Sequence, residues 1–192
     1  MRVQLQGKER RRKARNIRNT LAHATLIALS VAAGVAAITA PGLTEAVRGI
    51  TGRRQSQQQV YQAVQGLYRR GYITLAGTRG ERKALLTDAG RRAAYLHSLQ
   101  RKKPDRKKWD QTWFMVSFDV PKERKKARDS LRDKLKQLGF VQYHKSLYIH
   151  PCDYKSELDF IADYYDVTNC VFYFYSADIA RHDDLVRIFS LK

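Results

Sequence analysis

A single carboxylate stands where the most regular apolar run of the chain ends. Residues Trp113–Phe118 (WFMVSF) are apolar apart from Ser117, and Asp119 follows them directly. A carboxylate at the end of a strand can ligate Mg²⁺, an ion that needs six oxygen ligands and so requires further groups or waters. Asp119 can instead cap a helix, because Pro121, two residues later, suits a first helical turn. We favour capping; the alternative is a two-fold dimer that brings two copies of Asp119 to one metal ion.

A second group of side chains is suited to nucleic acid. Glutamine amides bond base edges, and arginine and lysine side chains bond phosphates. The base-reading candidates are Gln57, Gln58 and Gln62, and the phosphate-contact candidates are Arg53, Arg54, Arg69, Arg70, Arg79, Arg82 and Lys83. Solvated charges on an ordinary amphipathic helix and hairpin are the alternative interpretation.

The histidines and cysteines predict no catalytic or metal site. His144 and His150 flank a short apolar strand and are expected to be strand-end side chains. The triplet at 182–184 (HDD) is expected to be a solvated turn. Cys152 and Cys170 fall on non-neighbouring strands, which indicates free thiols in a reducing compartment. No phosphate loop or nucleophile motif occurs, so no cofactor is expected.

The elements around Asp119 follow a recognisable order. An apolar strand at 113–118 precedes a basic helix with Ala127, Leu131, Leu135 and Leu138 on one face and Gly139 at its end. Two short strands, a helix at 154–165 and the β-prone run VFYFY at 171–175 follow. This βαββαβ order predicts a ferredoxin-like domain over residues 111–192.

The glutamines and arginines lie on a second set of elements. Val60, Ala63, Val64 and Leu67 form one apolar face of a helix that Gly71 ends. The strand YITLA, the basic turn GTRGERK, the strand ALLT and a helix from Thr87 come next. Helix, strand, basic hairpin, strand and helix form the second half of a winged helix-turn-helix, which we expect over residues 19–100.

The net charge is distributed unevenly along the chain. The net charge is +19, and residues 153–192 carry eight acidic and four basic side chains. A polyanionic partner, either nucleic acid or an anionic membrane, is therefore expected to contact residues 1–152, which carry the excess of basic side chains. Residues 1–18 read as a disordered basic arm, and residues 101–110 as a basic linker around Pro104.

Residues 19–44 contain no charged side chain, and this length exceeds the ~20 residues that span a bilayer. Eight alanines and several polar residues make the segment much less apolar than a typical span, and basic residues flank it on both sides. We favour a buried helix with Ile27, Val31, Val35 and Ile38 on one stripe, because the face of Val60 and Leu67 needs a partner. A membrane-tethered protein is the alternative to a cytoplasmic one.

The run FDVPKERKKARDSLRDKLKQLGFVQYHKSLYIHP resembles the central domain of the PaaX family of transcriptional repressors. That family joins an N-terminal winged helix to this domain, which is also similar to the CRISPR-associated protein 2 family. In the latter family an Asp in the place of Asp119 pairs with its dimer mate to bind a divalent metal. The resemblance covers about residues 55–177. This chain differs from the PaaX repressors in its first ~50 residues, which are unlike the usual start of those proteins. It also differs at its end, where the repressors continue into a further domain.

The resemblance implies a transcriptional regulator that binds double-stranded DNA and forms a homodimer through its ferredoxin-like domain. The rival reading is a Mg²⁺-dependent endonuclease or a non-catalytic subunit of CRISPR spacer acquisition that uses Asp119. These sequence patterns do not identify the operator, an effector ligand, or whether the protein represses or activates transcription.

Overall fold

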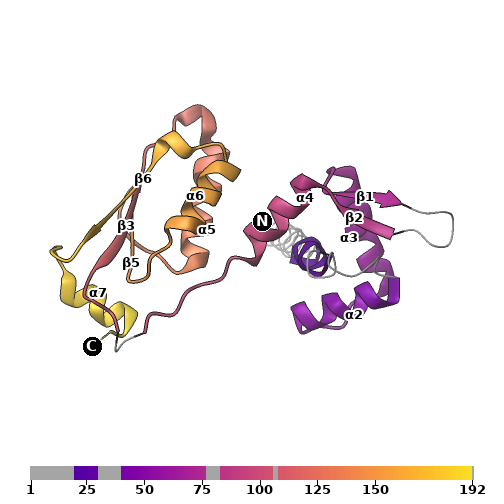
Figure 1. Cartoon of the computed structure of the whole chain (residues 1–192), viewed down its shortest axis with the longest axis horizontal. Coiled ribbons are helices and arrows are strands. Elements are labelled where there is room, and N and C mark those ends of the chain that lie inside the picture. Colours follow the sequence, from indigo (N-terminus) through magenta and orange to yellow (C-terminus); the bar gives the residue numbers. More distant parts are fainter. Residues whose placement is uncertain (1–19, 30–39, 77–82, 106–107, 192) are drawn as a thin grey trace, which may run out of the picture. The chain divides into compact units, whose positions relative to one another are not determined.

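The computed structural model of the protein describes residues 20–29, 40–76, 83–105 and 108–191. The chain divides into two compact units, residues 1–98 and residues 99–192 (Figure 1). Each unit has its own secondary structure and its own buried side chains. The basic arm that we predicted at residues 1–18 lies outside the described residues.

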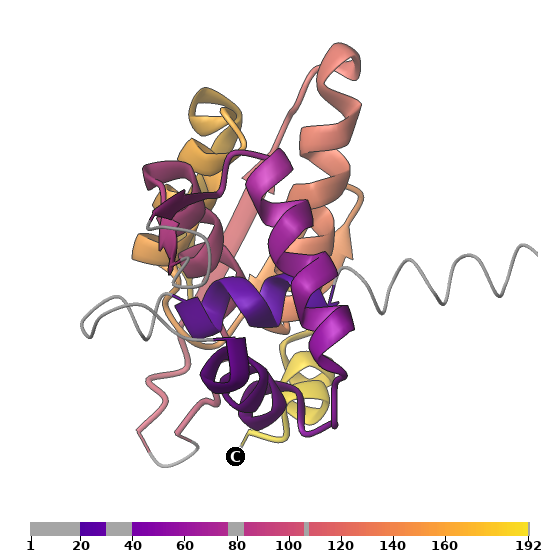
Figure 2. The same ribbon diagram turned by 90° about the vertical axis from the view of Figure 1, so that its right-hand side faces the viewer.

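The described residues of the first unit form helices and one small hairpin. After the helical residues 20–29, its elements are α2 (Ala40–Thr51), α3 (Gln57–Arg69), β1 (Ile73–Ala76), β2 (Lys83–Leu86) and α4 (Asp88–Ser98). The two strands pair antiparallel, with Ile73 opposite Leu86. Figure 2 shows the earlier helices crossing α3 rather than running alongside it. The predicted succession of helix, strand, strand and helix is confirmed.

The helical residues 20–29 are largely buried, including all of their leucines and alanines. The hydroxyl of Thr25 donates to the carbonyl oxygen of Leu21 at 2.8 Å, which satisfies a polar group inside the core. The His23 ring stacks on His97 of α4 with centroids 3.4 Å apart. The prediction of a core helix holds for this part, but Ile27, the one described member of the predicted stripe, is half-buried, whereas Leu21, Leu26 and Leu29 are buried. Val31, Val35 and Ile38 lie outside the described residues. None of the described helices combines the length and the apolar character that a membrane span requires.

Thr87 joins the hairpin, α4 and the end of α3. Its hydroxyl donates to the carbonyl oxygen of Gly71 at 2.7 Å and accepts from the N–H of Gly90 at 3.0 Å, so Thr87 caps α4. Its own N–H donates to the carbonyl oxygen of Tyr72 at 3.1 Å. Gly90 packs so closely here that a Cβ atom would overlap this carbonyl group of Tyr72.

The second unit is a four-stranded antiparallel sheet with three helices among its described residues. Its elements are β3 (Trp113–Phe118), a 3₁₀ turn (Lys122–Arg124), α5 (Lys125–Leu138), β4 (Val141–His144), β5 (Leu147–His150), α6 (Lys155–Tyr164), a second 3₁₀ turn (Thr168–Cys170), β6 (Val171–Ser176) and α7 (His182–Phe189). The strand order is β4-β5-β3-β6. The βαββαβ succession with this order is the predicted ferredoxin-like arrangement.

Both faces of this sheet carry apolar side chains. Helices α5 and α6 cover one face (Figure 1), and Leu131, Leu135 and Leu138 of α5 are buried as predicted. Trp113, Met115 and Ile149 belong to a second cluster, which they form with Leu185, Phe189 and Leu191. Cys152 and Cys170 are free thiols, as predicted.

The helix α7 was not predicted, and the HDD triplet forms its first turn rather than a solvated turn. The Nε1–H of Trp113 donates to Nδ1 of His182 at 3.2 Å, so His182 is tied to β3. Two acidic residues in this turn also suit the positive end of the helix dipole. The apolar signal of α7, Leu185 and Phe189 four residues apart, was too short to predict a helix without its partner surface.

The segment predicted as a basic linker is bound to the second unit at Lys102. Its N–H donates to Tyr154 Oη at 2.5 Å, and its Nζ lies 4.6 Å from the centre of the Tyr154 ring. The same Nζ donates to the carbonyl oxygen of Asp153 at 2.6 Å and pairs with Glu157 Oε1 at 2.8 Å. These contacts hold the ammonium group of Lys102 on its own unit.

Candidate nucleic-acid interface

Helix α3 is capped at both ends by local hydrogen bonds. Ser56 Oγ accepts from the N–H of Gln59 at 3.2 Å, and Gln59 Oε1 accepts from the N–H of Ser56 at 2.9 Å, which makes a capping box. At the other end Gly71 has φ +72°, and the N–H groups of Gly71 and Tyr72 donate to carbonyl groups of the last turn. The end of the helix at Gly71 was predicted from the sequence. The capping box was not predicted, although Ser56 and Gln59, three residues apart, are its sequence signal.

The apolar face of α3 fixes which side chains meet solvent. Val60 and Leu67 are buried, and Ala63 and Val64 are half-buried, which confirms the predicted face. Ile73 of β1 is also buried. Because one face of α3 is held against the unit, the opposite face must be exposed.

The three glutamines predicted to read bases, Gln57, Gln58 and Gln62, are all exposed on α3. Gln58 and Gln62 are one helical turn apart and therefore neighbours on its surface. Two exposed tyrosines share the helix and were missed: Tyr61 is 64% exposed and Tyr68 is 49% exposed. No charged residue occurs from Gln57 to Tyr68, so amide and phenol groups make up the polar surface of this stretch.

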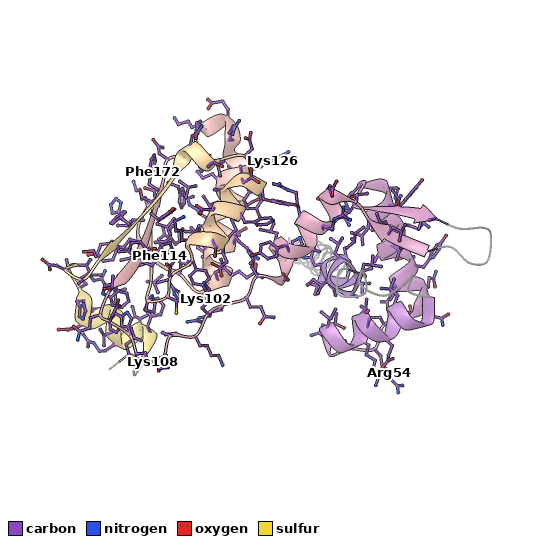
Figure 3. All side chains as sticks on the ribbon, viewed as in Figure 1. Arg54, Lys102, Lys108, Phe114, Lys126 and Phe172 are labelled. Atoms are coloured by element: carbon purple, nitrogen blue, oxygen red, sulfur yellow. The ribbon has the colours of Figure 1, made fainter. Side chains whose placement is uncertain are left out.

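Two arginine pairs bracket this uncharged stretch. Arg53 and Arg54 precede α3 and are exposed, and Arg54 projects from the unit into solvent (Figure 3). Arg69 is the last residue of α3 and is exposed, as is Arg70. Arg70 Nε donates to the carbonyl oxygen of Gly66 at 3.0 Å, and its guanidinium lies 5.6 Å from the centre of the Tyr72 ring. Arg70 is thus partly committed to its own helix, whereas no such contact holds Arg69 among the described residues.

The tip of the hairpin lies outside the described residues, and with it the predicted phosphate contacts Arg79 and Arg82. Lys83 is the first residue of β2 and pairs with Ala76. The strands on either side confirm a hairpin, and the role of its three basic residues stays a prediction.

Asp119 follows β3 as predicted and is exposed, but it does not cap a helix. The helix α5 begins at Lys125, after a 3₁₀ turn whose N-cap position is Pro121, and neither N-cap side chain makes a capping hydrogen bond. The N–H of Asp119 donates to the carbonyl oxygen of Cys170 at 2.9 Å, which continues the pairing of β3 with β6. The capping prediction was wrong because Pro121 starts a 3₁₀ turn and the α-helix starts four residues later.

A metal site is not formed by one copy of the described chain. Within the described ranges, no three His, Cys, Asp or Glu side chains lie close enough to share a metal ion. A second Asp119 from a dimer mate would add one carboxylate to the first. The remaining ligands of an octahedral Mg²⁺ ion would then have to be waters or nucleic acid.

His150 ends β5 as predicted and is fully buried. Its Nδ1 accepts from the N–H of Cys152 at 2.9 Å, and its ring lies against those of Phe140, Tyr154 and Phe189. Burial lowers the pKa of His150 to about 4, so the imidazole is neutral at neutral pH. His150 is therefore a core residue.

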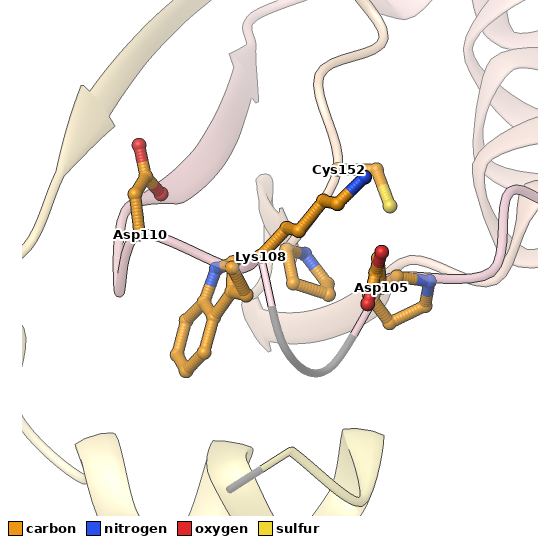
Figure 4. A pocket seen from close by; sticks show the side chains of 7 residues that line it. Asp105, Lys108, Asp110 and Cys152 are labelled. Atoms are coloured by element: carbon orange, nitrogen blue, oxygen red, sulfur yellow. The ribbon is translucent and has the colours of Figure 1, made fainter.

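An open pocket of about 250 Å³ lies in the second unit, where no binding site was predicted. Lys108 extends across it towards Cys152 (Figure 4). Its lining residues are Pro104, Asp105, Lys108, Trp109, Asp110, Pro151 and Cys152. None of the candidate nucleic-acid residues is among them.

The segment that forms the four-stranded sheet was compared with known domain families. Residues 106–186 match the family model described as the PaaX protein central Cas2-like domain. This segment is similar to a PaaX central Cas2-like domain. The resemblance inferred from its sequence is thereby confirmed for this range, and the Cas2-like domain includes β3 to β6. The matched residues do not include α3 or the hairpin, and no curated protein matched the chain.

Proposed function

We propose that the protein is a DNA-binding transcriptional regulator whose first unit is a winged helix-turn-helix. In this proposal α3 is the recognition helix and the β1–β2 hairpin is the wing. One observation carries it: the solvent face of α3 is uncharged and polar from Gln57 to Tyr68, on a chain of net charge +19, with exposed arginines at both ends.

This distribution of charge matches the two kinds of contact that DNA offers. Phosphates attract cations without regard to sequence, whereas base edges in the major groove present hydrogen-bond donors, acceptors and methyl groups. An α-helix with its side chains is about 10–12 Å in diameter, which matches the major groove of about 12 Å width, and the 13 residues of α3 extend about 20 Å along it. The arginines at its ends can then meet phosphates while the amides of Gln57, Gln58 and Gln62 meet bases.

Two further observations support the proposal. The order of helices, hairpin and final helix in the first unit is the order expected for a winged helix-turn-helix and so supports the proposal. The match of residues 106–186 to a PaaX central domain suggests a transcriptional regulator. Arg79, Arg82 and Lys83 would give the wing cations for the phosphates beside the groove.

We also propose that two copies pair through β6, which is an edge strand of the sheet. Its sequence VFYFYS carries no charge, and Phe172 is 60% exposed and Phe174 44% exposed. Figure 3 shows Phe172 on the opposite side of the unit from Lys126 of α5, so the basic helix does not interrupt this surface. A strand edge with exposed aromatic side chains and no charge suits a second copy of itself, because no like charges meet across a two-fold axis.

The proposal is tested by measuring the affinity for duplex DNA at several salt concentrations. Arg54→Ala is expected to lower the slope of log affinity against log salt by about 0.9 and to weaken binding to all sequences similarly. Gln58→Ala is expected to leave the slope unchanged and to relax preference at one base pair by about 1–3 kcal/mol. Lys155→Ala removes the same charge from α6 and is the matched control for Arg54, with no expected change in slope. Equal effects of Arg54→Ala and Gln58→Ala on sequence preference would contradict the assignment.

The endonuclease alternative is distinguished from the regulator proposal by incubating the protein with DNA and with RNA, with and without Mg²⁺. The regulator proposal predicts intact nucleic acid in every sample and the same DNA affinity for Asp119→Ala as for the wild type. Metal-dependent cleavage that disappears in Asp119→Ala would overturn the regulator proposal.

A further inference from the structure

Tyr61 is the most exposed of the large hydrophobic side chains in the described part of the chain. It is 64% exposed on α3, whereas Tyr148 and Tyr154 in the second unit are fully buried. A tyrosine ring left in water on a packed helix forgoes the burial that stabilises most tyrosines. Tyr61 therefore has apolar surface available for a partner.

The neighbours of Tyr61 on the helix are amides. Gln58 lies three residues before it and Gln65 four residues after it, so both are adjacent on the helix surface. The nearest cations in sequence are seven or more residues away, at Arg54 and Arg69. Tyr61 thus belongs to the part of α3 that the proposed function assigns to base reading and not to phosphate contact.

We propose that Tyr61 is a further specificity residue, whose ring packs on the 5-methyl group of a thymine beside the bases that Gln58 and Gln62 contact. This inference rests on the proposed function. The thymine methyl group is the apolar feature that the major groove presents, and an uncharged aromatic ring complements it. Tyr68 lies on the same flank two turns later, beside Arg69, where phosphate contact is expected.

Replacing thymine by uracil tests this inference, because the change removes only the methyl group. A preferred duplex is first selected from a random pool with the wild-type protein, and each of its thymines is then replaced singly. Wild type is expected to lose about fourfold in affinity at one or two positions, the effect of one buried methyl group. Tyr61→Ala is expected to bind thymine and uracil equally at those positions, and Tyr61→Phe to keep the wild-type preference.

Tyr68→Ala is the matched control and is expected to keep the wild-type response to uracil. The inference is overturned if Tyr61→Ala shows the wild-type uracil pattern, or if no thymine in the selected site is sensitive to the change. It is also overturned if Tyr61→Phe behaves as Tyr61→Ala does, since the hydroxyl would then make the contact. Failure of the wild type to retain any duplex in the first step would instead refute the proposed function, and the inference with it.

Discussion

Acid is expected to destabilise the second unit through His150. Burial lowers the pKa of this residue from its ordinary value of 6.5 to about 4. Between these values the unfolded chain binds a proton that the folded chain does not, so the contribution of His150 is present above pH 6.5 and is lost as pH falls towards 4. A difference of about 2.5 pKa units corresponds to about 3 kcal/mol in total, of which about 2 kcal/mol is lost by pH 5.

The geometry explains why the neutral form is required. Nδ1 of His150 accepts the N–H of Cys152, so a proton on Nδ1 would face another donor. Nε2 is buried and has no hydrogen-bond partner among the described residues, so the folded state offers no carboxylate that would stabilise the cation. Arg101 and Lys102 also lie near enough to oppose a positive charge there.

Urea unfolding at pH 7 and pH 5, followed by tryptophan fluorescence, measures this effect. Trp109 and Trp113 are the two tryptophans of the chain, and both lie in the second unit, so the signal reports that unit. His150→Asn keeps an oxygen acceptor on Cγ for the Cys152 N–H but cannot bind a proton. This variant is expected to be less stable at pH 7, because ring packing is lost, and to lose about 2 kcal/mol less than wild type between pH 7 and pH 5.

His144→Asn is the matched control, because His144 is exposed at the end of β4. Its loss of stability between the two pH values is expected to match that of the wild type. A His150→Asn variant with the full wild-type pH dependence would refute the argument, because the acid sensitivity would then come from other groups.

Two further predictions concern packing. Gly90→Ala is expected to destabilise the first unit by about 1–3 kcal/mol because its Cβ would overlap the Tyr72 carbonyl group, whereas Gly49→Ala in open space on α2 is expected to stabilise it by up to about 1 kcal/mol. Thermal unfolding followed by circular dichroism compares the two, and equal midpoints would contradict the close approach. Phe172→Glu is expected to turn a dimer into a monomer in sedimentation equilibrium, whereas Ile188→Glu, exposed on α7, is expected to leave the mass unchanged. A dimer that survives Phe172→Glu would place the interface elsewhere.

Local patterns predicted those elements whose signals are complete within a short stretch. The apolar stripe ending at Gly139 predicted α5, because helix periodicity and a left-handed terminal glycine are properties of neighbouring residues. The same reasoning predicted the buried face of α3 and the exposure of Gln58 and Gln62. It failed for the start of α5, because Asp119 and Pro121 are compatible with either a capped helix or a 3₁₀ turn.

The amino-acid sequence by itself determined the order of the elements, the excess of cations and the uncharged stretch between the arginine pairs. Only the tertiary structure decided that His150 is buried and neutral, that α7 covers Trp113, and that Lys102 is held by Tyr154. These features join residues from about 40 to about 80 positions apart, so no window of sequence contains both partners. Local periodicity specifies which face of an element is apolar, but the partner that covers it, and hence the burial that sets a pKa, is chosen by the packing of the whole unit.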